Sequence, residues 1–206
     1  MYVQMYGGAG GGQKRRMKKQ MAKRNILMYV SSVSGEGNTC RLADAFISGA
    51  RAAGHQVHRF FPGKAAVEGC RGCGACQKNG NQCVISDCMQ EAYPLIRESD
   101  TIAVASPLYF WTFSARAKAF LDRMYALSVN DIYPSKDTFF LMTADSDTEK
   151  TFSCAADYYH FITDALGWRD IGTYFAGGCS GEAGNHRISE EHLEKAYQAG
   201  FDLPER

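Results

Sequence analysis

Short runs of consecutive apolar residues alternate along this chain with longer segments of mixed polarity. Apolar runs of this length are typical of strands that are buried on both faces, as in a parallel sheet. The runs predict strands over Asn25–Ser31, Gln56–Phe61, Thr101–Ala105, Thr138–Thr143 and Asp170–Ala176. Capping residues and the helical spacing of apolar residues predict helices over residues 38–53, 87–98, 114–127, 148–166 and 189–199.

Strands that alternate with helices predict an α/β fold in which helices cover a parallel sheet of five strands. A length of 206 residues, 45% of them hydrophobic, fits a single domain with a well-developed core. Parallel sheets of this kind bind ligands beyond the carboxyl ends of their strands. We therefore expect a functional site in the loops that follow the first, third and fourth strands.

Basic residues are concentrated at the start of the chain. Residues 1–24 hold seven of the 23 Lys and Arg residues, no Asp or Glu, and a Gly-rich run. This composition predicts a disordered, basic tail, with residues 25–206 as the folded domain; a functional anion-binding arm is the alternative. The rest of the chain keeps 16 basic against 22 acidic residues, a balance that argues against nucleic acid as a partner.

No apolar stretch approaches the roughly 20 residues that span a bilayer, so we expect no membrane partner. The apolar run after the tail, ILMYV, is shorter than the apolar core of a signal peptide. Cysteines in a chain without an export signal predict a reducing environment, the cytoplasm.

The loop after the first strand, Ser31–Thr39, reads SSVSGEGNT and is rich in small and hydroxyl-bearing residues. Gly35 and Gly37 let the backbone approach a ligand closely, and the following helix offers free N–H groups and a positive dipole end. The pattern fits a phosphate cradle, and it also fits an ordinary strand-to-helix turn. Because the loop has neither Lys nor Arg, a cradle here suits the monophosphate of a mononucleotide better than a triphosphate.

The segment after the third strand, SPLYFWTF over residues 106–113, is expected to form a loop. It carries four aromatic residues, which a core position alone explains poorly. A planar ligand would account for these rings, and packing between two copies of the chain is the alternative.

Four of the eight cysteines lie in a Gly- and Asn-rich insertion at about residues 66–86, with the spacing C-x2-C-x2-C-x6-C. They are Cys70, Cys73, Cys76 and Cys83. Gly72 and Gly74 between them allow the positive φ angles and close amide approach that bridging sulfides need. Zinc sites more often use two separated C-x2-C pairs. The pattern leaves three alternatives open: an iron–sulfur cluster, free thiols, and zinc or a disulfide.

Three motifs in fixed order carry a resemblance to a known family. They are the loop ending in Gly37-Asn38-Thr39, the segment C-x2-C-x2-C…C-V-I-x-D, and S-P-L-Y-F followed by S-A-x-x-K-A-F-L-D-R. In this combination the chain resembles, over about residues 25–185, the flavodoxin-like NAD(P)H-dependent FMN reductases, which include the iron–sulfur flavoproteins.

The resemblance implies a three-layer sandwich with strand order 2-1-3-4-5, bound FMN, and NAD(P)H as the electron donor. For the four cysteines it implies a [4Fe-4S] cluster, although many relatives with similar cysteines function with FMN alone. The flavin carries the chemistry in such proteins, so no side chain is expected to be catalytic. The resemblance also implies a homodimer or a homotetramer.

The resemblance assigns the expected flavin contacts position by position. The phosphate is expected at Ser32, Ser34, Asn38 and Thr39. The ribityl chain and the ring system are expected at Pro107, Leu108, Tyr109, Phe110 and Trp111. The pyrimidine side of the ring is expected at Thr143, Ala144 and Asp145.

The chain departs from the family pattern in a few places that bear on function. Ser34 stands where Arg is common, Trp111 stands where Gly is frequent, and Asp145 and Ser146 replace small residues. We expect an oxidoreductase that passes electrons from NAD(P)H to a small acceptor, such as a quinone, a nitroaromatic or a flavin, or to a redox partner. The alternative is a non-enzymatic electron carrier or redox sensor.

Overall fold

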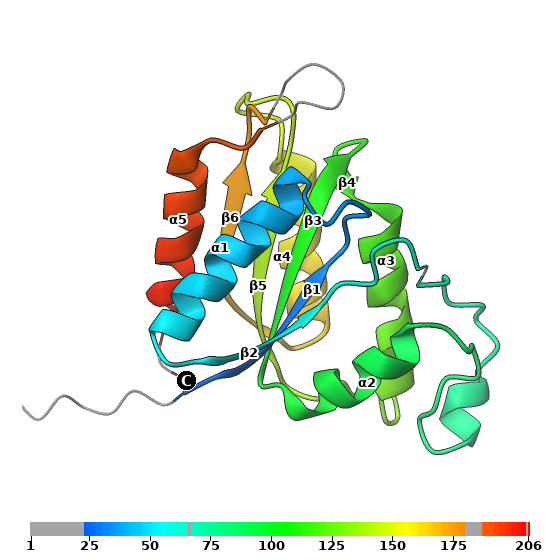
Figure 1. Ribbon diagram of the computed structural model, residues 1–206. Coiled ribbons are helices and arrows are strands. Elements are labelled where there is room, and N and C mark those ends of the chain that lie inside the picture. Colours follow the sequence, from blue (N-terminus) through cyan, green and yellow to red (C-terminus); the bar gives the residue numbers. More distant parts are fainter. Residues whose placement is uncertain (1–22, 66, 180–186, 205) are drawn as a thin grey trace, which may run out of the picture.

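The computed structural model describes residues 23–65, 67–179, 187–204 and 206, and it is built around a twisted parallel sheet (Figure 1). Its five parallel strands are β1 (Asn25–Val30), β2 (Gln56–Phe60), β3 (Thr101–Tyr109), β5 (Asp137–Thr143) and β6 (Arg169–Ala176). They lie in the order β2-β1-β3-β5-β6. With the short β4 set aside, this is the flavodoxin-like order 2-1-3-4-5, so the predicted fold class and strand order are confirmed.

Helices cover both faces of the sheet (Figure 1). They are α1 (Asn38–Ala52), α2 (Met89–Glu98), α3 (Ala115–Asp122), α4 (Ser153–Ala165) and α5 (Glu190–Phe201), with short 3-10 turns η1 (Ala75–Lys78) and η2 (Arg123–Leu127). None of the helices in the described ranges is long and apolar enough to span a bilayer.

Successive side chains of each strand enter two separate cores, because side chains alternate across a sheet. Leu27 and Tyr29 of β1 pack with α2, α3 and α4, whereas Ile26, Met28 and Val30 pack with α1 and α5. Helices α1 and α5 approach closely through two glycines, Gly49 and Gly200. A Cβ atom built on Gly49 would lie 1.9 Å from the carbonyl oxygen of Tyr197.

Three elements differ from the sequence-based expectation, and the first is the helix predicted over residues 114–127, which ends as α3 at Asp122 and continues as the 3-10 turn η2. The segment expected to be a loop after Ala105 continues as β3 to Tyr109, turns at two residues, and returns as β4 (Thr112–Phe113). The strand continues because Tyr109 and Thr112 pair across an antiparallel hairpin. Helix α4 begins at Ser153 rather than Thr148, because Thr148 and Thr151 close a hydrogen-bonded turn before it.

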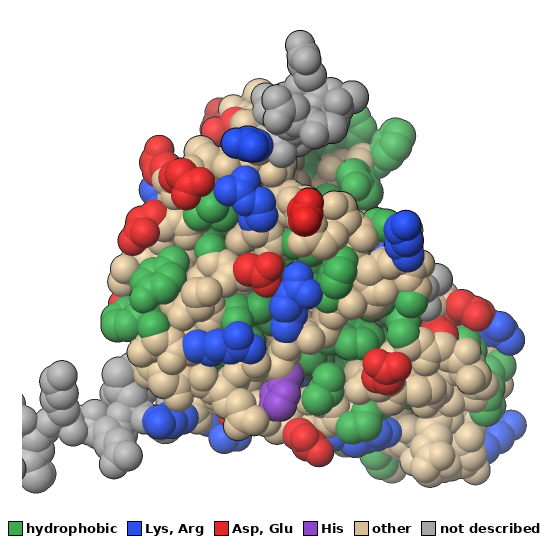
Figure 2. Space-filling view, viewed as in Figure 1, with side chains coloured by type: hydrophobic (Ala, Val, Ile, Leu, Met, Phe, Trp, Pro, Cys, Tyr) green, Lys and Arg blue, Asp and Glu red, His purple; other side chains and the backbone are tan. Residues whose placement is uncertain are grey.

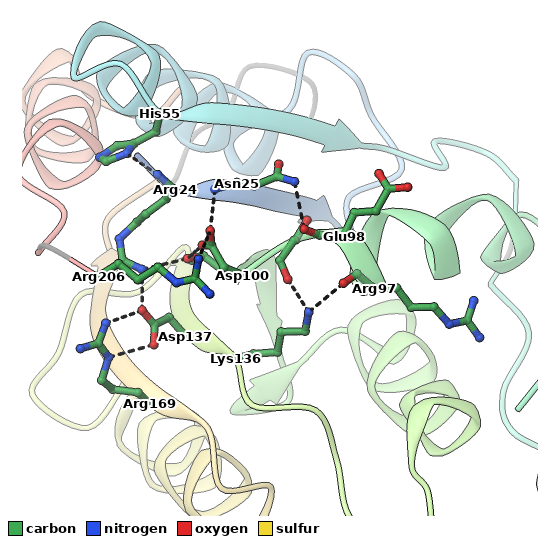
Figure 3. Close-up of polar contacts among 12 residues, drawn as sticks. Arg24, Asn25, His55, Arg97, Glu98, Asp100, Lys136, Asp137, Arg169 and Arg206 are labelled. Carbon is green, nitrogen blue, oxygen red and sulfur yellow. Dashed lines mark hydrogen bonds and ion pairs between the residues drawn. The ribbon is translucent and has the colours of Figure 1, made fainter. Parts of the chain in front are cut away.

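A charged network closes the amino-terminal ends of the strands (Figure 3). The buried guanidinium group of Arg24 donates to the Thr101 hydroxyl at 3.0 Å, to the Pro204 carbonyl at 2.7 Å, and to Asp137. The sequence analysis places Arg24 in the disordered tail, and the structure corrects this, because the Arg24 side chain joins β3, β5 and the carboxyl-terminal segment. Residues 1–22 lie outside the described residues, so the disordered tail stays a prediction for them.

Lys136, the residue before Asp137, caps the carboxyl end of helix α2 (Figure 3). Its buried ammonium group donates to three carbonyl oxygens at the end of that helix, those of Ile96, Arg97 and Ser99. The last carbonyls of a helix have no partner within the helix and carry negative partial charge, so a cation there stabilises the helix end.

His55 is a buried member of this region with one unused ring nitrogen. Its Nδ1 accepts a hydrogen bond of 3.1 Å from the backbone N–H of Arg24, and its Nε2 is buried without a partner among the described residues. Burial and the charge of Arg24 both disfavour the protonated ring, so the pKa of His55 is lowered.

We expect His55 to make stability fall in mild acid. The folded protein holds the ring neutral, whereas the unfolded chain binds a proton below about pH 6.5, so this contribution is present above that pH and is lost as the pH falls. His55→Gln, whose amide oxygen can accept the same N–H, should show a smaller drop in unfolding free energy between about pH 7 and pH 5. His58→Gln is the matched control, and an equal drop in the wild type and in His55→Gln would contradict the prediction.

Candidate functional site

A cavity of about 460 Å³ opens at the carboxyl ends of β1, β3 and β5. It lies between the loops that follow these strands, as expected for a parallel sheet at its switch point. Ten of the twelve residues expected to contact the flavin line this cavity: Ser32, Ser34, Asn38, Thr39, Pro107, Leu108, Tyr109, Thr143, Ala144 and Asp145. The other two, Phe110 and Trp111, line an adjoining cavity described below.

The start of α1 provides the donors of this cavity. Gly37 is the N-cap residue, and no side chain caps the helix. The first helical backbone bond runs from the N–H of Arg41 to the Gly37 carbonyl, so the preceding N–H groups have no partner within the helix. The hydroxyls of Ser32 and Ser34 lie beside them, with that of Ser32 donating to the Ser34 carbonyl at 3.2 Å, and a donor set of this kind fits the terminal phosphate of FMN.

Asn38 and Thr39 are already engaged by other parts of the chain. The Asn38 amide donates to the Cys179 carbonyl at 3.3 Å and accepts from the Ile188 N–H at 2.8 Å, which ties the segments after β6 to the start of α1. Asn38, the first residue of the helix predicted over residues 38–53, therefore does not cap α1 with its side chain. The hydroxyl of Thr39 lies 2.7 Å from that of Thr143, so it joins α1 to the end of β5.

A chain of buried serine hydroxyls positions the segment after β3, and the sequence analysis did not identify it. Ser114 caps α3 by accepting from the Ala117 N–H at 3.2 Å, and its hydroxyl donates to that of Ser31 at 2.9 Å. The hydroxyl of Ser106 accepts from the backbone N–H of Ser114 at 3.0 Å. These contacts hold the hairpin against the loop after β1. In the sequence, the signal for these contacts is the serine that begins each of the S-P and S-A motifs.

The hairpin between β3 and β4 presents three exposed aromatic residues. The exposed fractions of Tyr109, Phe110 and Trp111 are 61%, 93% and 62%. Figure 2 shows hydrophobic side chains projecting from the molecule where the hairpin ends. Phe110 and Trp111 occupy the two turn positions with φ of 48° and 60°, which glycine and asparagine usually fill.

A second cavity of about 440 Å³ lies between this hairpin and the loop after β5. It shares Leu108, Ala144 and Asp145 with the first cavity, so the two cavities adjoin in one cleft. One end of the cleft is rich in backbone and hydroxyl donors, and the other end has an aromatic wall. This arrangement can hold a molecule with a phosphate at one end and a planar ring at the other.

The four cysteines of the insertion do not converge in this structure. Cys70 and Cys73 are exposed, Cys83 is half-buried and Cys76 is buried. Among the residues that the structure describes, no three Cys, His, Asp or Glu side chains are placed to hold a metal ion. Gly72 and Gly74 do adopt the expected positive φ angles, of 62° and 65°. As arranged here, the four thiols do not fit a cluster.

Arg123 holds the cysteine segment to the body of the protein. Its guanidinium group, 1% exposed, makes two hydrogen bonds to the Asp87 carboxylate at 2.8 and 3.1 Å, and it also donates to the carbonyls of Glu68 and Ile85. Burial alone would raise the pKa of Asp87, but hydrogen bonds from Arg123 and from the Glu68 N–H outweigh it and the pKa is lowered. The Asp of C-V-I-x-D and the Arg of F-L-D-R are therefore partners in one buried ion pair.

Amide side chains and two apolar residues complete the attachment of this segment. Gln77 donates to the Tyr125 carbonyl at 2.9 Å, and Asn81 donates to the Ser128 carbonyl at 2.7 Å. Val67 and Ile85 are buried. The segment thus has anchors on η2 and on Ser128, which follows it, and these anchors do not involve the cysteine sulfurs.

Comparison with known proteins agrees with this geometry. Residues 24–180 match the family described as NADPH-dependent FMN reductase. An iron–sulfur flavoprotein of Archaeoglobus fulgidus is 35% identical over 88 residues, which are 43% of this chain and 40% of that protein. One of Methanosarcina thermophila is 34% identical over 104 residues, which are 48% of this chain and 54% of that protein. The chain thus spans about half the length of the curated relatives it matches.

Among solved structures, the fold is similar to that of an NAD(P)H:quinone oxidoreductase from Methanothermobacter marburgensis. The TM-score is 0.67, with 17% identity over 88% of this chain and 99% of that chain. At that identity the likeness concerns the fold alone. The family match covers most of this chain, and the chain therefore belongs to the NADPH-dependent FMN reductase family of oxidoreductases.

Proposed function

We propose that this protein binds FMN in the cleft formed by the two cavities and passes electrons from NAD(P)H to a small planar acceptor, such as a quinone, a nitroaromatic or a flavin. The observation that carries the proposal is the gathering of ten expected flavin contacts, from three separate loops, around one cavity at the ends of the strands. The family membership supports both the cofactor and the donor.

The residues of the cleft divide the task of holding FMN. The N–H groups at the start of α1, with Ser32 and Ser34, would hold the phosphate through the helix dipole and hydrogen bonds. Pro107, Leu108 and Tyr109 would lie along the ribityl chain and the ring, and the loop from Thr143 would meet the pyrimidine side. When bound, FMN supplies hydride acceptance and electron transfer, whereas the protein binds, orients and shields it.

We propose a homodimer or a homotetramer as the functional state, because the exposed aromatic hairpin would gain burial against a second copy. We also propose a reducing cytoplasm as its location, which the absence of a disulfide among the described cysteines supports.

The enzyme proposal predicts turnover with a quinone. Protein purified without oxygen should show flavin absorbance, NADPH or NADH should bleach it, and an added quinone should restore it while the donor is consumed. Negligible oxidation of both donors would contradict the enzyme and would favour the alternative, an electron carrier that exchanges with a protein partner.

The phosphate site can be tested with two matched variants. Thr39→Val and Thr143→Val remove the same hydroxyl pairing, but only Thr39 is expected to contact the phosphate. A hydrogen bond to a charged acceptor contributes about 1.5–3 kcal/mol, so Thr39→Val should lose at least about tenfold in FMN affinity relative to riboflavin affinity. Thr143→Val, at the expected pyrimidine side of the ring, should change both affinities by the same factor, as measured by quenching of flavin fluorescence. An unchanged ratio of FMN to riboflavin affinity in Thr39→Val would place the phosphate elsewhere.

For the cysteine segment, we propose that the Arg123 contacts make it fold without metal. In chelator-treated protein the wild type and Cys73→Ser should resist proteolysis at residues 66–86. Arg123→Lys keeps the positive charge but loses the planar guanidinium group with its several donors. This variant should be cleaved within the cysteine segment and should lose about 1.5–3 kcal/mol of unfolding free energy.

Arg41→Lys, in an exposed ion pair with Glu190, is the control and should change stability by less than about 1 kcal/mol. Cleavage of the metal-free wild type within the segment would contradict this proposal. Iron and sulfide per FMN are compared between anaerobic wild type and Cys73→Ser. Iron that falls in the variant assigns a cluster, and equal iron excludes one.

A further inference from the structure

The second cavity is lined by a lysine, Lys150, which is not among the expected flavin contacts. It is bounded by the aromatic hairpin on one side and by the loop from Ala144 to Thr151 on the other. Two charged residues line it, Asp145 and Lys150. Asp145 also lines the first cavity, whereas Lys150 lines the second alone, as Phe110 and Trp111 do.

The loop wall that carries Lys150 is held in place by hydroxyl groups. The hydroxyl of Thr151 accepts from the Thr148 N–H at 2.9 Å, lies 2.9 Å from the Thr148 hydroxyl, and reaches that of Ser146 at 3.3 Å. Thr151 is buried, and the next residue, Phe152, stacks on Phe175 at 5.0 Å. Lys150 therefore extends from a turn that is already formed.

The opposite wall carries backbone strain at the residues that face the cavity. Phe110 and Trp111 adopt positive φ angles, which bulky residues rarely do, and their rings meet edge to face with centroids 6.3 Å apart. Such strain persists where the surrounding structure enforces it, and it is concentrated at ligand clamps. Here the turn places two large rings across from Lys150, although both rings remain largely exposed.

We propose that this cavity is a subsite for planar aromatic molecules that carry a negative group, such as aromatic carboxylates or sulfonates, and that Lys150 determines that preference. The ring would lie beside the flavin ring and share with it the aromatic wall of Trp111 and Phe110, and the anionic group would point to Lys150 and away from Asp145. This inference rests on the proposed function, because it names the class of acceptor that the same cleft selects.

The test uses two ligands of nearly equal shape and different charge, 2-naphthoate and 2-naphthamide, titrated calorimetrically into the FMN-loaded protein. One exposed charge pair contributes up to about 1 kcal/mol, so the wild type should bind the naphthoate about fivefold more tightly. Lys150→Gln should bring the two affinities together, and Lys150→Arg should keep the preference. Added salt should weaken the preference in the wild type.

Lys195→Gln removes the same charge from α5, where Lys195 pairs with Glu191, and it should leave the preference unchanged. Trp111→Ala should weaken the binding of both ligands and leave the ratio of their affinities unchanged. The inference would be overturned by equal affinities in the wild type, by a preference that survives in Lys150→Gln, or by binding of neither ligand. Because neither ligand needs to be reduced, these results are independent of quinone turnover: lost turnover refutes the proposed function, and a missing preference refutes only the role of Lys150.

Discussion

The buried ion pair between Asp87 and Arg123 is the contact on which the irregular half of this protein depends. Both side chains are almost fully removed from solvent, at 7% and 1% exposed. Charges in such surroundings are tolerated only when the partner and further hydrogen bonds satisfy them. Arg123 meets that condition by also binding the carbonyls of Glu68 and Ile85, so one side chain at the start of η2 holds both ends of the cysteine segment.

The two ends of the sheet have opposite roles. At the amino-terminal end, the buried charges of Arg24 and Lys136 and the half-buried Asp137 satisfy polar groups at strand and helix ends (Figure 3). At the carboxyl end, α1 has no side-chain cap and two aromatic residues hold a strained turn. Unsatisfied donors and strain are unfavourable for stability alone, and they lie where a ligand would use them.

For the cysteine segment, whether the thiols bind a metal and what gives the segment its order are two different questions. The spacing C-x2-C-x2-C-x6-C suggests that metal ligation creates the local order. The structure instead shows anchors from Gln77, Asn81 and Arg123 that do not involve sulfur. A segment held this way can keep its thiols exposed, and a cluster would require Cys70 and Cys73 to turn toward Cys76.

The sequence by itself determined the fold class, the five parallel strands and the loops that form the site. Those features follow from local apolar runs and from glycine and hydroxyl patterns, which act over a few residues. Only the tertiary structure decided that Asn38 binds Cys179 and Ile188, that Thr39 pairs with Thr143, and that the segment after Ala105 extends as a hairpin. These contacts join residues up to 150 positions apart. The energy of such contacts depends on which strands become neighbours, and no local pattern contains that information.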